Sequence, residues 1–289
     1  MKVLVTGVKG QLGHDVVKAL QARGHEAIGV DIEEMDITDC TQVESVLLRV
    51  KPHAVIHCAA WTAVDKAEQC PDTVYKVNAL GPKYIAEGCK RIGAKMAFIS
   101  TDYVFAGTGS TPYAPDDARE GLSVYGKTKM QGEDFVRAAL ESHYIVRITW
   151  AFGVNGGNFV KTMLRLASSG KTELSVVNDQ IGSPTYTVDL ARLLVDMIES
   201  DRYGVYHATN EGYCSCYDFA CEIFRQAGKQ IKVNPVSTEE YRQMVPQQAR
   251  RPLNSRLDKS ALIENGFAPL PPWQDALKRY LEELQNGAN

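Results

Sequence analysis

Apolar, β-branched runs alternate with segments of helical spacing through the first half of the chain, and this alternation constrains the fold more than any other feature. Runs typical of strands lie at residues 2–6, 26–30, 54–60, 95–100 and 144–150. Segments whose apolar residues recur every three or four positions lie between them, at 11–23, 41–50, 72–92 and 124–142. Strands and helices that alternate at this interval form βαβ units, whose parallel strands are covered on both faces. The sequence therefore predicts an α/β fold built on a doubly wound parallel sheet.

The first junction between a strand and a helix carries three glycines at three-residue spacing, Gly7, Gly10 and Gly13, in the stretch TGVKGQLG. Glycines in this position permit a tight turn, let the backbone approach a pyrophosphate and let the helix pack close to the strand. The N–H groups at the start of the helix, together with its dipole, favour a bound anion. The pattern predicts a dinucleotide site of the Rossmann type, and a simple turn before a helix is the alternative interpretation.

Asp31 ends the second expected strand, near the place where an acidic residue binds the adenosine ribose hydroxyls of a dinucleotide. A carboxylate at this place would repel the 2′-phosphate of NADPH. We therefore expect NADPH or NADH as the cofactor, and Asp31 favours NADH. An ordinary loop aspartate is the alternative.

The regular alternation loosens after residue 150. Helical segments are expected at 158–169, 187–200, 217–228 and 273–285, with strand-like runs ELSVV and GVYHA between them. The Pro-rich stretches VNPVS, RRPLNS and APLPPW are predicted to be loops. We expect a dinucleotide-binding Rossmann domain over 1–150 and a smaller, mainly substrate-binding region over 151–289. The two are expected to interleave, with 187–208 returning to the Rossmann part.

The stretch VYGKTK places Tyr125 and Lys129 four residues apart on an expected helix, so both side chains face the same way. A phenol has an ordinary pKa near ~10, and a lysine ammonium beside it would lower that pKa by favouring the phenolate. Tyr125 would then serve as a general acid for a carbonyl oxygen while hydride reaches the carbon. Thr101, directly after the fourth expected strand, could hydrogen-bond the same oxygen. The alternative is a surface Tyr/Lys pair.

Composition excludes several other classes of protein. The 289 residues carry a formal net charge of −3, which argues against nucleic acid as the main partner. No apolar stretch approaches the roughly eighteen residues that span a bilayer, so no membrane is expected. The first residues lack the features of a signal peptide, and the seven cysteines form no C-x-x-C pair. We expect reduced thiols, no metal site and a cytoplasmic protein.

The chain resembles the extended short-chain dehydrogenase/reductase family in three features: Gly7-x-x-Gly10-x-x-Gly13, Thr101 and Tyr125-x-x-x-Lys129. Within that family it is similar to the branch of dTDP-4-dehydrorhamnose reductases. The segments that carry this likeness are STDYVF, VYGKTK, RITWAFG, NFVKTMLRLA, VVNDQIGSPTY and RRPLNSRL. The similarity runs from Met1 to about Leu284. It implies NAD(P)H-dependent reduction of the 4-keto group of dTDP-4-dehydro-L-rhamnose to dTDP-L-rhamnose, in dTDP-rhamnose biosynthesis.

The resemblance also implies roles for individual residues, by motif match. The catalytic residues would be Tyr125, Lys129 and Thr101. The cofactor would meet Gly7, Gly10, Gln11, Leu12, Gly13, Asp31, Asp36, Ile37, Ala60, Trp61, Thr62, Ile99, Tyr125 and Lys129. The dTDP-sugar substrate would meet Thr101, Asp102 and Trp150, and also Arg251, because an arginine fork suits a pyrophosphate. Solvated surface charge is the alternative for Arg251, and a core aromatic is the alternative for Trp150.

Some members of this branch are described as dimers that hold a magnesium ion with carboxylates. Asp15 and Glu283 match two of those positions, whereas the third falls at Val188, beside Asp189. One ligand is therefore missing, so no metal is predicted, and a homodimer remains possible.

Two other functions are open on the same scaffold. A nucleotide-sugar epimerase or dehydratase would regenerate its cofactor in each turnover, and dehydratases usually add an acidic pair beside the threonine. Here Asp102-Tyr103 follows Thr101 without an adjacent glutamate, which favours simple reduction. A non-catalytic regulatory subunit, like the methionine adenosyltransferase β subunit, is the other alternative, and the intact Thr101, Tyr125 and Lys129 weigh against it.

Overall fold

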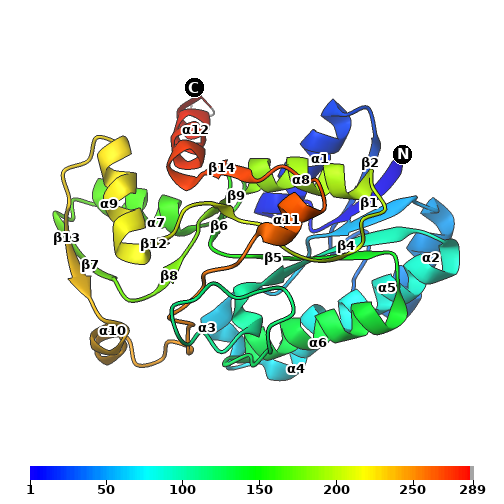
Figure 1. Ribbon diagram of the computed structural model, residues 1–289, viewed down its shortest axis with the longest axis horizontal. Helices are drawn as coiled ribbons and strands as arrows, with labels where there is room; N and C mark the ends of the chain where they lie inside the picture. Colours follow the sequence, from blue (N-terminus) through cyan, green and yellow to red (C-terminus); the bar gives the residue numbers. More distant parts are fainter. Residues whose placement is uncertain (287–289) are drawn as a thin grey trace.

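A six-stranded parallel sheet forms the centre of the molecule in a computed structural model that describes residues 1–286 (Figure 1). Its strands are β1 (Lys2–Thr6), β2 (Glu26–Val30), β3 (Ala54–His57), β4 (Lys95–Thr101), β5 (His143–Ile148) and β10 (Gly204–His207). The order across the sheet is β10-β5-β4-β3-β1-β2. In the register of the sheet, Thr6 lies opposite Val30 on one side and His57 on the other. The predicted α/β fold with a doubly wound parallel sheet is confirmed.

Helices cover both faces of this sheet (Figure 1). One face carries α1 (Gln11–Ala22) and α8 (Thr187–Ile198), and the other carries α2 (Cys40–Val50), α5 (Gly81–Ile92) and α6 (Val124–Ala139). The alternation of side chains along each strand fixes this arrangement. Val3 and Val5 of β1 pack in the cluster that includes α1 and α8, whereas Leu4 between them packs in the cluster on the opposite face.

The second half of the chain contributes a separate hydrophobic cluster beside the sheet. Its main elements are α7 (Phe159–Ser168), β7 (Glu173–Val177), α9 (Cys216–Gln226), β13 (Lys232–Val236), α10 (Thr238–Met244) and α12 (Trp273–Asn286). Aromatic side chains dominate this cluster, among them Phe152, Phe219, Trp273 and Tyr280. Figure 1 shows these elements at the left of the sheet, with α12 above them.

Short elements connect the larger ones. In the first half they are α3 (Val64–Ala67), α4 (Pro71–Tyr75), the π-helical turn η1 (Lys76–Leu80) and the 3₁₀ turn η2 (Asp102–Val104). In the second half they are β6 (Ala151–Phe152), β8 (Ile181–Gly182), β9 (Thr185–Tyr186), β11 (Asn210–Glu211), β12 (Cys214–Ser215), α11 (Ser260–Glu264) and β14 (Leu270–Pro272).

The second half also returns to the central sheet. Helix α8 packs in the same core cluster as α1, and β10 pairs in parallel with β5, with Val205 opposite Ile145. The segment from 187 to 207 therefore lies in the layers of the first half. The assignment of binding functions to two domains stays a prediction.

Three local predictions were wrong. The stretches VNPVS and APLPPW form strands β13 and β14 rather than loops. Strand β13 pairs only with β7 in a two-stranded sheet, and Pro235 is tolerated because one edge of the strand needs no N–H donor. The helix expected to reach residue 142 ends at Ala139, where the chain becomes extended at Leu140.

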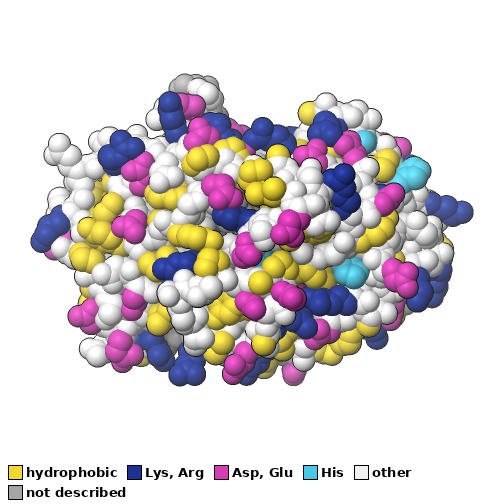
Figure 2. Space-filling model, in the orientation of Figure 1, with side chains coloured by type: hydrophobic (Ala, Val, Ile, Leu, Met, Phe, Trp, Pro, Cys, Tyr) yellow, Lys and Arg dark blue, Asp and Glu magenta, His cyan; other side chains and the backbone are white. Residues whose placement is uncertain are grey.

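The charges on the face shown in Figure 2 mix both signs, with Lys and Arg side chains interspersed among Asp and Glu. All seven cysteines are unpaired in the described part of the chain. Within residues 1–286, no helix combines the length and the apolar character needed to cross a membrane.

Candidate active site

A cavity of about 620 Å³ lies at the carboxyl ends of β1, β3, β4 and β5. Open α/β sheets bind ligands in this crevice, where the winding of the chain reverses. The predicted site residues that line the cavity are Gly7, Gly10, Gln11, Leu12, Gly13, Asp31, Ala60, Thr62, Ile99, Thr101, Asp102, Tyr125, Lys129 and Trp150. The fold therefore brings side chains from six separate segments to one place.

The glycine-rich turn forms one wall of this cavity. Gly7 has a positive φ of 70°, and a β-carbon on Gly13 would lie 2.3 Å from the carbonyl oxygen of Gly7. Helix α1 begins directly after Gly10, whose position at the N-cap supplies no side-chain acceptor for the first N–H groups. An uncapped helix start that faces a cavity is a ready anion site, so this wall fits the diphosphate of a dinucleotide.

Asp31 lies at one end of the same cavity. Its carboxylate accepts the backbone N–H of Lys9 at 3.0 Å and that of Ile32 at 3.0 Å. The Lys9 ammonium pairs with Glu33 at 2.5 Å instead of with Asp31. Asp31 therefore lies beside the glycine-rich turn and forms no ion pair among the described residues, and its role at the ribose stays a prediction.

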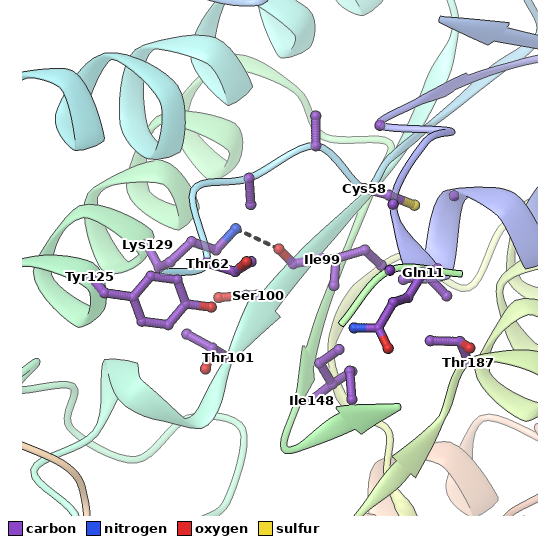
Figure 3. A pocket seen from close by; sticks show the side chains of 18 of the residues that line it. Gln11, Cys58, Thr62, Ile99, Ser100, Thr101, Tyr125, Lys129, Ile148 and Thr187 are labelled. Carbon is purple, nitrogen blue, oxygen red and sulfur yellow. Dashed lines mark hydrogen bonds between the residues drawn. The ribbon is translucent and has the colours of Figure 1, made fainter. Parts of the chain in front are cut away.

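Tyr125 and Lys129 project into the cavity from consecutive turns of α6 (Figure 3). The hydroxyl of Ser123 caps this helix by accepting the N–H of Gly126 at 3.1 Å. The Lys129 ammonium donates to the carbonyl oxygen of Ile99 at 2.6 Å and lies 4.1 Å from the centre of the Phe98 ring. Figure 3 shows the Tyr125 hydroxyl turned toward Ser100 and Thr101 at the end of β4.

Burial shifts the pKa values of Lys129 and Tyr125 in the directions that favour the neutral form of each side chain. Desolvation lowers the pKa of Lys129 to about 7, although the negative charge of Glu133 partly opposes this. Desolvation also raises the pKa of Tyr125 well above that of an ordinary phenol, and the Thr101 side chain offsets only part of the rise. The expectation that Lys129 lowers the pKa of Tyr125 is therefore wrong: burial raises that pKa, and the Lys129 ammonium donates to the carbonyl oxygen of Ile99.

Thr101 and Asp102 are both buried at the end of β4. The Thr101 hydroxyl donates to Asp102 at 2.9 Å and accepts the N–H of Tyr103 at 3.2 Å. Ser255, from the far end of the chain, donates its hydroxyl to the other oxygen of Asp102. Burial raises the pKa of Asp102 to about 6, and these two hydroxyls moderate the rise. Asp102 therefore ties the first half of the chain to the segment around Ser255.

A second cavity of about 530 Å³ adjoins the first and is lined mostly by the second half of the chain. Four residues line both cavities: Thr62, Tyr103, Trp150 and Ala151. Arg251 lines the second cavity and donates to the Tyr103 hydroxyl at 3.1 Å. The two cavities thus meet beside Tyr103, whose ring packs edge-on against that of Tyr125 with centres 5.3 Å apart.

Trp150 stands at this junction in an unusual backbone conformation. Its φ is +45°, a left-handed value that bulky residues rarely adopt. The ring packs against Gly182, where a β-carbon would lie 3.1 Å from it. Strained conformations of this kind persist where the surrounding structure enforces them, often at ligand sites.

Comparisons with known proteins fit this geometry. A family model described as "RmlD substrate binding domain" matches residues 1–286. The chain belongs to the RmlD family. It is 42% identical over 288 residues to the spore coat polysaccharide biosynthesis protein SpsK of Bacillus subtilis, covering 100% of this chain and 99% of that protein. The resemblance found in the sequence is thereby confirmed.

Solved structures of RmlD-family proteins agree along the whole chain. A dTDP-4-dehydrorhamnose reductase from Clostridium acetobutylicum matches with a TM-score of 0.95 and 45% identity, over 99% of this chain and 100% of that one. A dTDP-4-dehydrorhamnose reductase from Bacillus anthracis, solved in complex with NADP, matches with a TM-score of 0.93 and 40% identity, over 98% and 99% of the two chains.

Three residues predicted to meet the cofactor do not line either cavity of this RmlD-family chain. Asp36 accepts the backbone N–H and the hydroxyl of Thr38, each at 2.8 Å, and so closes a local turn. Ile37 is buried in the core cluster on the side of α2 and α5. The Trp61 indole donates to the carbonyl of Ala63 at 3.2 Å. Their cofactor roles stay predictions.

Sequence reasoning missed the residues that support the site from behind. Asn78, in the π-helical turn η1, is buried and bonds the backbone of Trp61 in both directions, at 2.8 and 3.1 Å. Such a turn often marks a functional place in a helix, but its position depends on these tertiary bonds. Tyr103 could have been noticed, since it stands two residues after Thr101 in the quoted stretch STDYVF.

A buried ionic cluster holds α6 against the sheet. Glu133, one turn beyond Lys129, receives two bonds of 2.8 Å from Arg147 of β5 and one of 2.6 Å from Ser100 of β4. Arg119 adds a second cation at 3.0 Å. These positive groups hold the pKa of Glu133 below its usual range despite burial. The cluster fixes the height of α6, and so of Lys129, above the end of β4.

The carboxylates matched to a family magnesium site are engaged with protein groups. Asp15 accepts the hydroxyl of Thr187 at 2.5 Å, and Glu283 accepts that of Tyr186. Asp189 receives two bonds from Arg279, at 2.9 and 2.7 Å. Within residues 1–286, no group of three or more His, Cys, Asp or Glu side chains could hold a metal ion. Asp15 Oδ1 is buried without a hydrogen-bond partner in the described part of the chain, the absence of a metal stays a prediction, and the proposed reaction uses none.

Proposed function

We propose that this chain catalyses the reduction of the 4-keto group of dTDP-4-dehydro-L-rhamnose to dTDP-L-rhamnose with NADH or NADPH, in dTDP-rhamnose biosynthesis. The observation that carries the proposal is the pair of adjoining cavities in an RmlD-family chain, with Tyr125, Lys129 and Thr101 beside their junction. One cavity suits a dinucleotide, and the other suits the nucleotide part of the substrate. The keto sugar would lie between them.

The glycine-rich turn and the start of α1 would hold the cofactor diphosphate, with Asp31 at the adenosine ribose. Ala60, Thr62 and Ile99 would lie at the nicotinamide end of the same cavity. A bound nicotinamide supplies the hydride for the carbonyl carbon. The chain's own contribution is to hold the keto group beside that position, with its oxygen toward Tyr125.

Tyr125 would donate the proton. Its phenol is protonated at neutral pH, as an ordinary phenol is, and desolvation raises its pKa further, so the proton moves only when negative charge develops on the substrate oxygen. The nearby Lys129 ammonium, when charged, would stabilise the phenolate that remains. Thr101, whose hydroxyl donates to Asp102 in the structure, would position the same oxygen by turning that hydrogen to the keto group.

Trp150 and Asp102 are proposed to contact the sugar, and Arg251 the diphosphate of the substrate. Support comes from their places in the lining: Trp150 borders both cavities, Asp102 the first and Arg251 the second. A guanidinium suits a diphosphate because its N–H groups match the spacing of phosphate oxygens. A homodimer remains a proposal that rests on the family resemblance, and a cytoplasmic location remains one that rests on the sequence composition.

The test is a cofactor-oxidation assay with dTDP-4-dehydro-L-rhamnose and each cofactor in turn, followed by the loss of nicotinamide absorbance. We expect stoichiometric oxidation of the cofactor and formation of dTDP-L-rhamnose. Product formation without net oxidation would instead indicate an epimerase or dehydratase. Binding of both ligands without any turnover would indicate a regulatory subunit.

A further inference from the structure

Asp65, in the first turn of α3, joins the two halves of the site across a long stretch of sequence. Its carboxylate accepts the backbone N–H of Ala249 at 3.0 Å. It also accepts the Nη2 group of Arg251, at 3.1 Å on one oxygen and 2.9 Å on the other. Asp65 directly follows Val64, which lines the first cavity, whereas Arg251 lines the second. One carboxylate therefore anchors a loop of the second half to the cofactor side.

Arg251 is held from two sides, and its guanidinium keeps N–H groups that no residue in the described part of the chain accepts. Its Nη1 group donates to the Tyr103 hydroxyl, and Nη2 is taken by Asp65. Its Nε atom is buried and has no hydrogen-bond partner in the described part of the chain. Nη1 has only the Tyr103 hydroxyl as an acceptor among the described residues, so its second N–H is left for an acceptor that a ligand brings into the second cavity.

We propose that Asp65 is a positioning residue for the substrate: it fixes the Arg251 guanidinium at the boundary of the two cavities so that the remaining Nη1 hydrogen meets the diphosphate of the nucleotide sugar. This inference rests on the proposed function. An ordinary exposed ion pair contributes little to stability. The Asp65–Arg251 pair differs because Arg251 lines the proposed substrate cavity. Charge-assisted bonds to Asp65 also fix the plane of the guanidinium, so the remaining N–H group keeps one direction toward the cavity.

A double-mutant cycle tests the proposal, with Asp65→Ala, Arg251→Ala and the double variant. Mutations that act through one contact are not additive. We expect Asp65→Ala to raise KM for the keto sugar and Kd for dTDP by about tenfold while kcat changes by less than about twofold. In the Arg251→Ala background, Asp65→Ala is expected to change the KM for the keto sugar and the Kd for dTDP by less than about twofold.

Two further variants separate positioning from general stability. Asp72→Ala removes an exposed carboxylate in the first turn of α4. We expect this variant to have the KM for the keto sugar and the Kd for dTDP of the wild type. Asp65→Glu keeps a carboxylate that can reach Arg251, so it is expected to recover part of the lost dTDP affinity. The Kd for NADH and the melting temperature of Asp65→Ala are expected to remain those of the wild type.

The proposal would be overturned if Asp65→Ala bound dTDP as tightly as the wild type. It would also be overturned if Asp65→Ala weakened dTDP binding equally in the wild type and in Arg251→Ala. A loss of NADH affinity as large as the loss of dTDP affinity would also overturn it, because Asp65 would then only hold α3 in place. The dTDP titration needs no turnover. It therefore judges Asp65 even if the wild-type chain fails to reduce the keto sugar, a result that would reject the proposed function by itself.

Discussion

Desolvation favours the neutral forms of both Lys129 and Tyr125, one helical turn apart on α6. The Lys129 pKa falls to about 7, and the Tyr125 pKa rises above its ordinary value. Near neutral pH the cofactor-free protein therefore holds a protonated phenol beside an ammonium that is only partly charged. Cofactor phosphates brought into the same cavity would favour the charged ammonium again.

Cofactor binding is consequently expected to take up a proton. At pH 8 the free protein lies above the Lys129 pKa of about 7, so most Lys129 side chains are neutral before NADH binds. NADH affinity is then expected to fall as pH rises above about 7, because binding is linked to protonation. Calorimetry at pH 8 in two buffers of different ionisation enthalpy measures the uptake, and Lys129→Met is the control that should abolish it. Proton release on binding would contradict the assignment.

Cofactor choice is expected to depend on Asp31. The Asp31→Ala variant removes a negative charge from the end of the cavity where an adenosine 2′-phosphate would lie, so kcat/KM with NADPH is expected to rise relative to NADH. Measuring kcat/KM with both cofactors, for wild type and variant, gives the ratio directly. An unchanged ratio would mean that Asp31 does not face the ribose.

At the scale of elements, periodicity alone predicted most of the sheet and its helices. Strands β1 and β2 begin and end where their β-branched runs do, and α1 begins where the glycine pattern predicts. The misses have tertiary causes. Pro235 sits in a strand because β13 has a free edge, and η1 interrupts a helix where Asn78 bonds Trp61. Neither partner is visible from the local sequence.

The junction of β1 and α1 tolerates no side chain at its third glycine. In Gly13→Ala the new methyl would lie 2.3 Å from the Gly7 carbonyl oxygen, so the turn must shift. We expect a loss of about 1–3 kcal/mol of stability and at least about tenfold weaker NADH binding, measured by thermal unfolding and fluorescence titration.

Gly157→Ala is the matched control for this change. Gly157 lines the same cavity, but a β-carbon there meets no atom within 4 Å. We expect its effect on unfolding to be slight. If Gly13→Ala bound NADH as tightly as the wild type, close packing of α1 on the turn would not matter for the cofactor.

At the scale of the whole molecule, the site is a meeting of distant segments. The sequence motifs predicted the glycine-rich turn and the Tyr125–Lys129 pair that line the first cavity, because each is a pattern of a few neighbouring residues. Contacts such as Ser255 with Asp102, or Asp65 with Arg251, join residues more than a hundred positions apart. No local pattern encodes such a pairing, so the second cavity and its boundary became visible only in the folded chain.

The central claim is that Tyr125 gives its proton to a keto sugar held between the two cavities. Its most direct test is the turnover of dTDP-4-dehydro-L-rhamnose by Tyr125→Phe beside the wild type, with the Kd for NADH measured on both. The variant keeps the ring and loses only the hydroxyl. We predict that NADH binding survives while kcat falls by roughly 10²–10⁴, the range typical of a lost general acid. Near-full turnover by Tyr125→Phe would contradict the account.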